Sequence, residues 1–145
     1  MVMEGCPTCE SIANGTYPNI ILENEFALAE ACDTFREGHC VVAVKRHMIS
    51  PSAMNPEEWS GTFELISKVS KALETKYGAR KTYVIMIGDR NKWQHLHFHL
   101  IPKHRNLPSM GAYCIVKLQE AEGTRNPTEE QQAALANDLK TLIEA

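Results

Sequence analysis

The heptapeptide His95-Leu96-His97-Phe98-His99-Leu100-Ile101 decides how the rest of this sequence is interpreted. Side chains of a β-strand point alternately to its two faces, so the three histidines would share one face and the apolar residues between them the other. The apolar face would pack on a core, and the histidine face would line a site or, alternatively, lie exposed on the surface. A single metal ion held by all three rings is disfavoured, because the Cα atoms of His95 and His99 would lie about 13 Å apart on an extended strand.

Other strand candidates surround this stretch. Residues 82–87 form a β-rich run that we expect to pair with 95–101 as an antiparallel hairpin. Residues 40–44 are mostly β-branched and predict a buried strand. Residues 26–32 predict a strand paired with the short apolar run before them, although their Ala, Leu and Glu also suit a helix, so both alternatives stay open. A further strand is expected at 113–118.

Two helices are predicted by their start signals. Asn55 can cap a helix in which Pro56 takes the first position and Glu58 bonds back to the cap. Apolar residues then recur at spacings of three and four, which gives this long helix one apolar face. A second capping box at Thr128 predicts a C-terminal helix over 127–144. The elements together predict an α+β fold, a mostly antiparallel sheet with the long helix and the C-terminal helix packed on it.

The chain of 145 residues has the size of one domain, so we expect residues 1–145 to form a single domain that begins with a loop over 1–19. Its 43% hydrophobic and 23% charged residues are typical of a folded protein and exclude a disordered one. A formal net charge of -3 argues against nucleic acid binding through bulk charge. No apolar run is long enough for a membrane span and no leader pattern is present, so we expect a cytoplasmic protein.

The histidine stretch resembles the signature of the histidine triad (HIT) superfamily of nucleotide hydrolases and transferases, His-x-His-x-His-x-x with apolar residues at most x positions. Upstream, Gly38-His39-Cys40-Val41-Val42-Ala43-Val44-Lys45-Arg46-His47 is similar to the family's Gly-His, buried strand and Lys-Arg-His. The resemblance covers residues 20–104 and implies a HIT-like fold. It also implies a nucleotide-type small-molecule substrate and a two-fold homodimer.

The central histidine is the nucleophile in that family, a role that the resemblance assigns to His97. A neutral imidazole, with a pKa of about 6.5, is a good nucleophile at pH 7 and could form a covalent nucleotidyl-histidine at the α-phosphorus. His99 is expected to hydrogen-bond the bridging or leaving atom. Related transferases usually carry Gln at that position, so His99 favours hydrolysis of a phosphoanhydride or phosphoramidate. The alternative is a zinc-stabilised nucleotide-binding or partner-binding module with little or no turnover.

One branch of the family holds a structural zinc ion through two cysteines and two histidines. Cys6, Cys9, His47 and His95 match those positions, and such a ligand set forms a normal closed zinc site. The alternative is a flexible N-terminal segment with two reduced thiols. The remaining cysteines, which are Cys32, Cys40 and Cys114, are expected to be small apolar core residues.

The sequence departs from the family where the nucleoside binds. Ala31 stands where many members carry an Asp that holds the ribose. In the lead-in to the triad, Asn91, Lys92 and Gln94 could contact phosphate together with His99, although each is also an ordinary loop residue. The two remaining histidines are expected to be structural (His39) and on the surface (His104).

Overall fold

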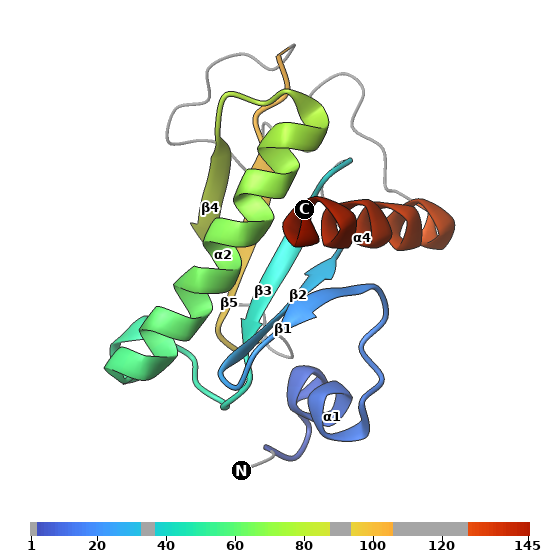
Figure 1. Cartoon of the computed structure of the whole chain (residues 1–145). Coiled ribbons are helices and arrows are strands. Elements are labelled where there is room, and N and C mark those ends of the chain that lie inside the picture. Colours follow the sequence, from blue (N-terminus) through green and yellow to red (C-terminus); the bar gives the residue numbers. More distant parts are fainter. Residues whose placement is uncertain (1–2, 33–36, 88–93, 106–127) are drawn as a thin grey trace.

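A computed structural model of the chain describes residues 3–32, 37–87, 94–105 and 128–145. Its centre is an antiparallel five-stranded sheet with the strand order β1-β2-β3-β5-β4 (Figure 1). The strands are β1 (Ile20–Glu23), β2 (Ala27–Ala31), β3 (Cys40–Val44), β4 (Thr82–Met86) and β5 (His97–Pro102). The predicted α+β class is therefore confirmed, and β2 is a strand rather than a helix.

The long helix α2 (Pro56–Tyr77) and the C-terminal helix α4 (Glu129–Glu144) cover one face of this sheet (Figure 1). Both begin with the predicted capping boxes, at Asn55 and at Thr128, because the side chain at the third helical position bonds back to the cap. Their apolar faces and the inward side chains of the strands form one continuous core. None of the described helices is long and apolar enough to cross a membrane.

The N-terminal segment differs from the predicted loop, because a short helix, α1 (Pro7–Asn14), forms within it. Pro7 suits the first helical position, the sulfur of Cys6 accepts a hydrogen bond from the Cys9 backbone N–H, and Gly15 ends the helix in the left-handed conformation. The two cysteines therefore lie one helical turn apart. Figure 1 shows α1 at one end of the sheet, below β1 and β2.

Strand β5 begins at His97, so His95 lies just before it in a bend rather than within a strand. Phe98 and Leu100 belong to the core, which places His97 and His99 on the sheet face opposite α2. Across the strands, Ala43 of β3 pairs with His97. The strand expected at 113–118 lies outside the described residues.

Candidate functional site

The ring of His97 is held by the backbone of the residue two positions before it. Its Nδ1 lies 2.6 Å from the carbonyl oxygen of His95. A carbonyl oxygen can only accept, so Nδ1 carries the hydrogen and donates it. In the neutral ring the lone pair is then on Nε2, which is the atom that a nucleophilic imidazole needs free. His97 is half-buried, so one side of the ring remains accessible.

His99 is linked to a histidine that the sequence placed outside the site. His39 Nε2 and His99 Nδ1 lie 2.9 Å apart, and the two rings stack with their centroids 5.1 Å apart. The ring of His97 meets that of His99 edge-on, with centroids 4.8 Å apart. Three imidazoles from two neighbouring strands, β3 with its lead-in and β5, therefore form a continuous row.

Burial keeps two members of this row neutral. Desolvation, followed by the nearby His99 and His97, lowers the pKa of His39 to about 3. Desolvation and His97 lower the pKa of His99 to about 4. At neutral pH both rings are uncharged, so each presents one N–H donor and one lone pair. His39 and His99 can therefore accept and donate hydrogen bonds, but neither ring carries the positive charge of an imidazolium.

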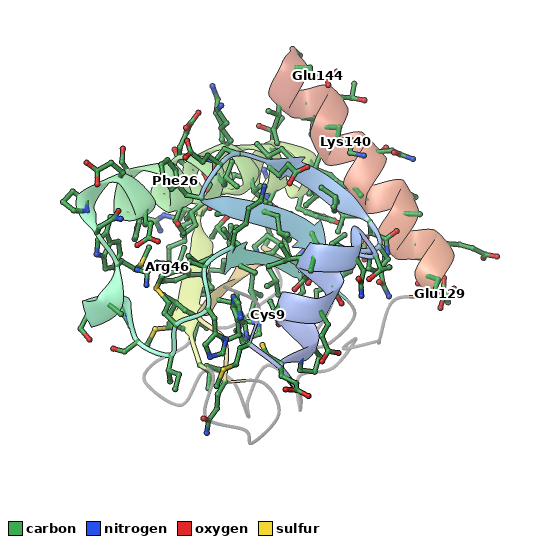
Figure 2. The ribbon with its side chains drawn as sticks, turned by 90° about the horizontal axis from the view of Figure 1, so that it is seen from below. Cys9, Phe26, Arg46, Glu129, Lys140 and Glu144 are labelled. Carbon is green, nitrogen blue, oxygen red and sulfur yellow. The ribbon has the colours of Figure 1, made fainter. Side chains whose placement is uncertain are left out.

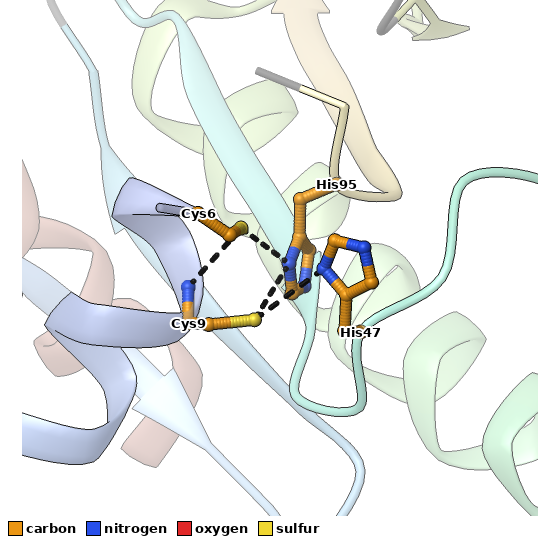
Figure 3. Close-up of side chains that lie close together, drawn as sticks. All are labelled: Cys6, Cys9, His47 and His95. Atoms are coloured by element: carbon orange, nitrogen blue, oxygen red, sulfur yellow. Dashed lines mark hydrogen bonds between the residues drawn. The ribbon is translucent and has the colours of Figure 1, made fainter. Parts of the chain in front are cut away.

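Four side chains that are far apart in sequence meet at the end of the sheet beside α1 (Figure 3). The nearest ligand atoms of Cys6, Cys9, His47 and His95 all lie within 4.8 Å of one another. Nδ1 of His95 lies 3.4 Å from the sulfur of Cys6 and 3.5 Å from that of Cys9, and His47 Nδ1 lies 3.4 Å from the sulfur of Cys9. In a tetrahedral site with Zn–S near 2.3 Å and Zn–N near 2.0–2.1 Å, the S···N edges would be about 3.5 Å. The cluster therefore has the donor set and the spacing of a metal site.

The ring of His95 has the tautomer that this arrangement requires. Its Nε2 lies 2.6 Å from the carbonyl oxygen of Val44, so Nε2 carries the hydrogen and Nδ1 faces the two sulfurs with its lone pair. A hydrogen bond from the second ring nitrogen to a backbone carbonyl is the usual way in which proteins orient a metal-ligating histidine. Burial lowers the pKa of His95, which favours the neutral ring that can act as a ligand.

A pocket of about 430 Å³ lies beside His97. Its other described lining residues are mostly apolar side chains from three segments: Ile49, Met86, Ile87, Gln94, His95 and Leu96. Gln94 is thus next to the site, whereas the other two predicted phosphate contacts, Asn91 and Lys92, lie outside the described residues. Ala31 is buried in the core, so it faces away from the histidine row.

Sequence reasoning missed His39 as a member of the row. The contact joins residues 60 positions apart, and it depends on how β3 pairs with β5. The available signal was the Gly38-His39 pair directly before a buried strand. His104, expected on the surface, is half-buried and contacts the ring of Tyr77.

The family model of the HIT domain matches residues 17–106, which include the histidine row and two of the four residues of the cysteine–histidine cluster, His47 and His95. The chain belongs to the HIT domain family. A search of curated proteins found no significant match. The comparison with solved structures, by contrast, returns HIT proteins, some of which cover 96–98% of this chain.

Three such structures illustrate the likeness. A HIT-like protein involved in cell-cycle regulation from Bartonella henselae has a TM-score of 0.73 at 16% identity, with 98% of this chain and 99% of that one covered. A zinc-bound histidine triad protein from Mycobacterium smegmatis has a TM-score of 0.70 at 19% identity, covering 96% and 93%. A diadenosine triphosphate hydrolase from Plasmodium falciparum has a TM-score of 0.66 at 14% identity, covering 87% and 76%. At these identities the likeness establishes the shared HIT fold.

Proposed function

We propose that this HIT protein is a nucleotide hydrolase that cleaves a nucleotidyl phosphoanhydride or phosphoramidate, with His97 as the nucleophile. The single observation that carries the proposal is the hydrogen bond from His97 Nδ1 to the His95 carbonyl oxygen, which leaves the lone pair on Nε2 of this half-buried ring. Membership of a family that contains nucleotide hydrolases supports the same reading.

The reaction would proceed in two displacements. His97 Nε2 attacks the α-phosphorus, the new N–P bond forms, and the bond from phosphorus to the leaving group breaks with its electron pair. Water then attacks the same phosphorus and loses a proton to the solvent, and the N–P bond breaks with its electron pair returning to Nε2. This step releases the nucleoside monophosphate and returns His97 to its starting state. The hydrogen bond to the His95 carbonyl grows stronger as the ring becomes cationic in the intermediate, because a charged donor bonds more strongly than a neutral one.

His99 would assist as a hydrogen-bond donor. If His39 Nε2 donates to His99 Nδ1, then His99 Nε2 carries a hydrogen that can point to the bridging or leaving atom. Because burial lowers the pKa of His99 to about 4, its ring is neutral at pH 7 and carries no imidazolium proton to transfer, so His99 would stabilise the developing negative charge by a hydrogen bond alone. His39 would be a positioning residue that fixes the orientation of His99.

We further propose that Cys6, Cys9, His47 and His95 hold one structural zinc ion, which would tie α1 and the segment after β3 to the triad strand. Bound zinc supplies stability and orientation here, since four protein ligands would leave no open position for substrate. Two zinc-bound thiolates persist in a reducing compartment, which is consistent with the cytoplasm.

A homodimer is also proposed. Strand β4 is at one edge of the sheet, so its outer side offers unpaired backbone groups. Beside it lies an apolar patch, which we define as Trp59 and Phe63 of α2 and Val84 and Met86 of β4, each exposed by about a third or more. Pairing of two such edges about a two-fold axis would bury the patch and extend the sheet.

The hydrolase is tested by trapping its intermediate. Wild-type protein, mixed with an adenylate substrate in a single turnover and quenched, should carry a nucleotidyl adduct on the peptide that contains His97. His97→Ala should lose the adduct and several orders of magnitude in rate while keeping its fold, because the side chain fills no core space. The matched control is His104→Ala, which removes a half-buried histidine outside the histidine row, on the segment after β5. An unchanged rate in His97→Ala would favour the alternative, a zinc-stabilised binding module.

A further inference from the structure

Arg46 and Glu58 form a two-pronged ion pair next to the metal-ligating cluster. The guanidinium donates from Nε to Glu58 Oε1 at 2.6 Å and from an Nη to Oε2 at 2.8 Å. The same guanidinium group also donates to the carbonyl oxygen of Ala53 at 2.7 Å. Parallel bonds of this kind between charged groups are strong and fix direction as well as distance. The Glu58 side chain is only 7% exposed, so the pair is largely shielded on the carboxylate side.

The Arg46–Glu58 pair joins the two ends of the segment between β3 and α2, which contains His47. Arg46 immediately precedes His47, and its partners lie on the short helix η1 (Pro51–Ala53) and at the first turn of α2. Figure 2, which looks at this end of the molecule, shows Arg46 pointing toward the start of α2. The guanidinium thus bridges the two ends of the segment between β3 and α2.

His47 depends on its backbone for its position more than its three companions do. It is half-exposed, whereas Cys6, Cys9 and His95 are buried. After His47, the backbone is held by the hydrogen bond from Leu96 N–H to the Met48 carbonyl at 2.7 Å. Before His47, the nearest side-chain anchor is Arg46. The ring itself contacts the His95 ring edge-on, with centroids 5.2 Å apart, and the Cys9 sulfur, so fixed flanking residues help to keep this half-exposed ring in place.

We propose that Arg46 and Glu58 are a positioning pair for the metal site, which sets how firmly His47 holds zinc. This inference rests on the proposed zinc site and extends it to two residues that ligate nothing. The pair joins the site to the cap of α2, because Glu58 Oε2 also accepts from the Asn55 backbone N–H at 2.9 Å. A shift of Arg46 would move the main chain at His47, and the ligand geometry with it.

Glu58→Gln weakens the Arg46–Glu58 ion pair but keeps the helix cap at Asn55. Glutamine also serves at the third position of a capping box, so its amide oxygen can still accept from Asn55 N–H. Its amide nitrogen would then face the Arg46 guanidinium, which only donates, so one prong is lost. Arg46→Lys is the second variant, since it keeps the charge but cannot form the fork, and its half-exposed side chain should leave the fold intact.

The experiment measures zinc release from the chain of 145 residues. Zinc-loaded wild type and both variants are mixed with an excess of a chromogenic chelator, and the release rate is followed by absorbance. Partners that orient metal ligands typically change metal affinity by 10–100-fold, and for this more distant pair we expect release about 10-fold faster. The matched control is Glu23→Gln, which breaks the ion pair of the neighbouring Lys45 and should release zinc at the wild-type rate.

A spectroscopic readout distinguishes positioning from a general loss of stability. Cobalt(II) in the same four-ligand site gives visible absorption bands that report its geometry, and these bands should shift in Glu58→Gln but not in Glu23→Gln. If Glu58→Gln and Arg46→Lys both released zinc at the wild-type rate and showed the wild-type cobalt bands, the inference would be overturned while the zinc proposal stayed in place. A wild-type protein that holds no zinc after expression with zinc would overturn the zinc proposal and this inference together.

Discussion

His97 donates its Nδ1 hydrogen to the carbonyl oxygen of His95 at 2.6 Å, while the ring of His95 faces two cysteine sulfurs. His95 thus contacts both parts of the site. Its carbonyl oxygen accepts a hydrogen bond from His97, and its ring faces the sulfurs of Cys6 and Cys9. Because the ring is further fixed by the Val44 carbonyl, movement of His95 is constrained at two points. The cluster of Cys6, Cys9, His47 and His95 and the histidine row are therefore linked through His95.

Removal of zinc should weaken the fold and the histidine row together. A chelator should lower the melting temperature of wild-type protein by roughly 5–10 °C, since a structural metal stabilises only the folded chain. Turnover should fall as His97 loses its fixed acceptor. Calorimetry and a rate assay, with and without chelator, measure both effects. The control is Cys6→Ser/Cys9→Ser, whose melting temperature should not respond to the chelator. A wild type that retains its zinc-loaded melting temperature after complete metal removal would contradict this expectation.

The neutral histidine pair predicts a specific pH dependence of stability. Folding lowers the pKa of His99 to about 4 from its usual 6.5, so below pH 6.5 the unfolded chain binds a proton that the folded chain refuses. The resulting stabilisation is fully present above pH 6.5 and is lost as the pH falls toward 4. For this one group the loss is at most about 3 kcal/mol, and the equally neutral His39 acts in the same direction.

Urea unfolding at several pH values measures this dependence. Between pH 6.5 and 4.5 the free energy of unfolding of His99→Asn should fall less steeply than that of wild type, whatever its absolute stability. The matched control is His104→Asn, which removes a half-buried histidine outside the histidine row and should run parallel to wild type. If the curves of His99→Asn and wild type were also parallel, the titration of His99 would not be the source of the acid sensitivity.

Elements with local signals were predictable from the sequence. The cap of α2 involves Asn55 and Glu58, three residues apart, and the box at Thr128 is equally local, so both helices were predicted correctly. Helix α1 was missed because its cap is a cysteine sulfur and its eight residues include Pro, Thr and Asn, which favour loops. The cysteines at its start contact His95, which is more than 80 positions away in the sequence, and no local pattern reveals such contacts.

The histidine row was only half predictable, because one of its contacts depends on the sheet. Alternation along residues 95–101 placed His97 and His99 on one face, but the bend that turns His95 toward the cysteines has no local signal. The partner of His99 is His39, whose side chain reaches it only because β3 and β5 pair in one register. Spacing in the sequence does not encode that register.

Gly38, which directly precedes His39, has a backbone conformation that other residues avoid. Its φ is +86°, and a Cβ there would lie 2.7 Å from Tyr77 Cε2 and 2.8 Å from Pro102 Cγ. Gly38→Ala should therefore destabilise the fold by about 2–4 kcal/mol and slow turnover by displacing His39. Gly15→Ala is the matched control, since its φ is also positive but its Cβ would meet nothing within 4 Å, so it should lose only about 1 kcal/mol. Equal losses in the two variants, measured by urea unfolding, would show that crowding at Gly38 is unimportant.

The proposed dimer should depend on the edge of the sheet at β4. Met86 is 45% exposed on that edge strand, and it pairs with Phe98, whose ring meets Phe63 of α2. A charge at this position would have to be buried between two copies, so Met86→Lys should convert the dimer to a monomer. Light scattering at micromolar concentration should give twice the mass of one chain for wild type and the mass of one chain for Met86→Lys. Leu142→Lys, an equally drastic change at an exposed apolar residue of α4, should remain dimeric. A wild type with the mass of one chain would remove the dimer, and dissociation by Leu142→Lys alone would move the interface to α4.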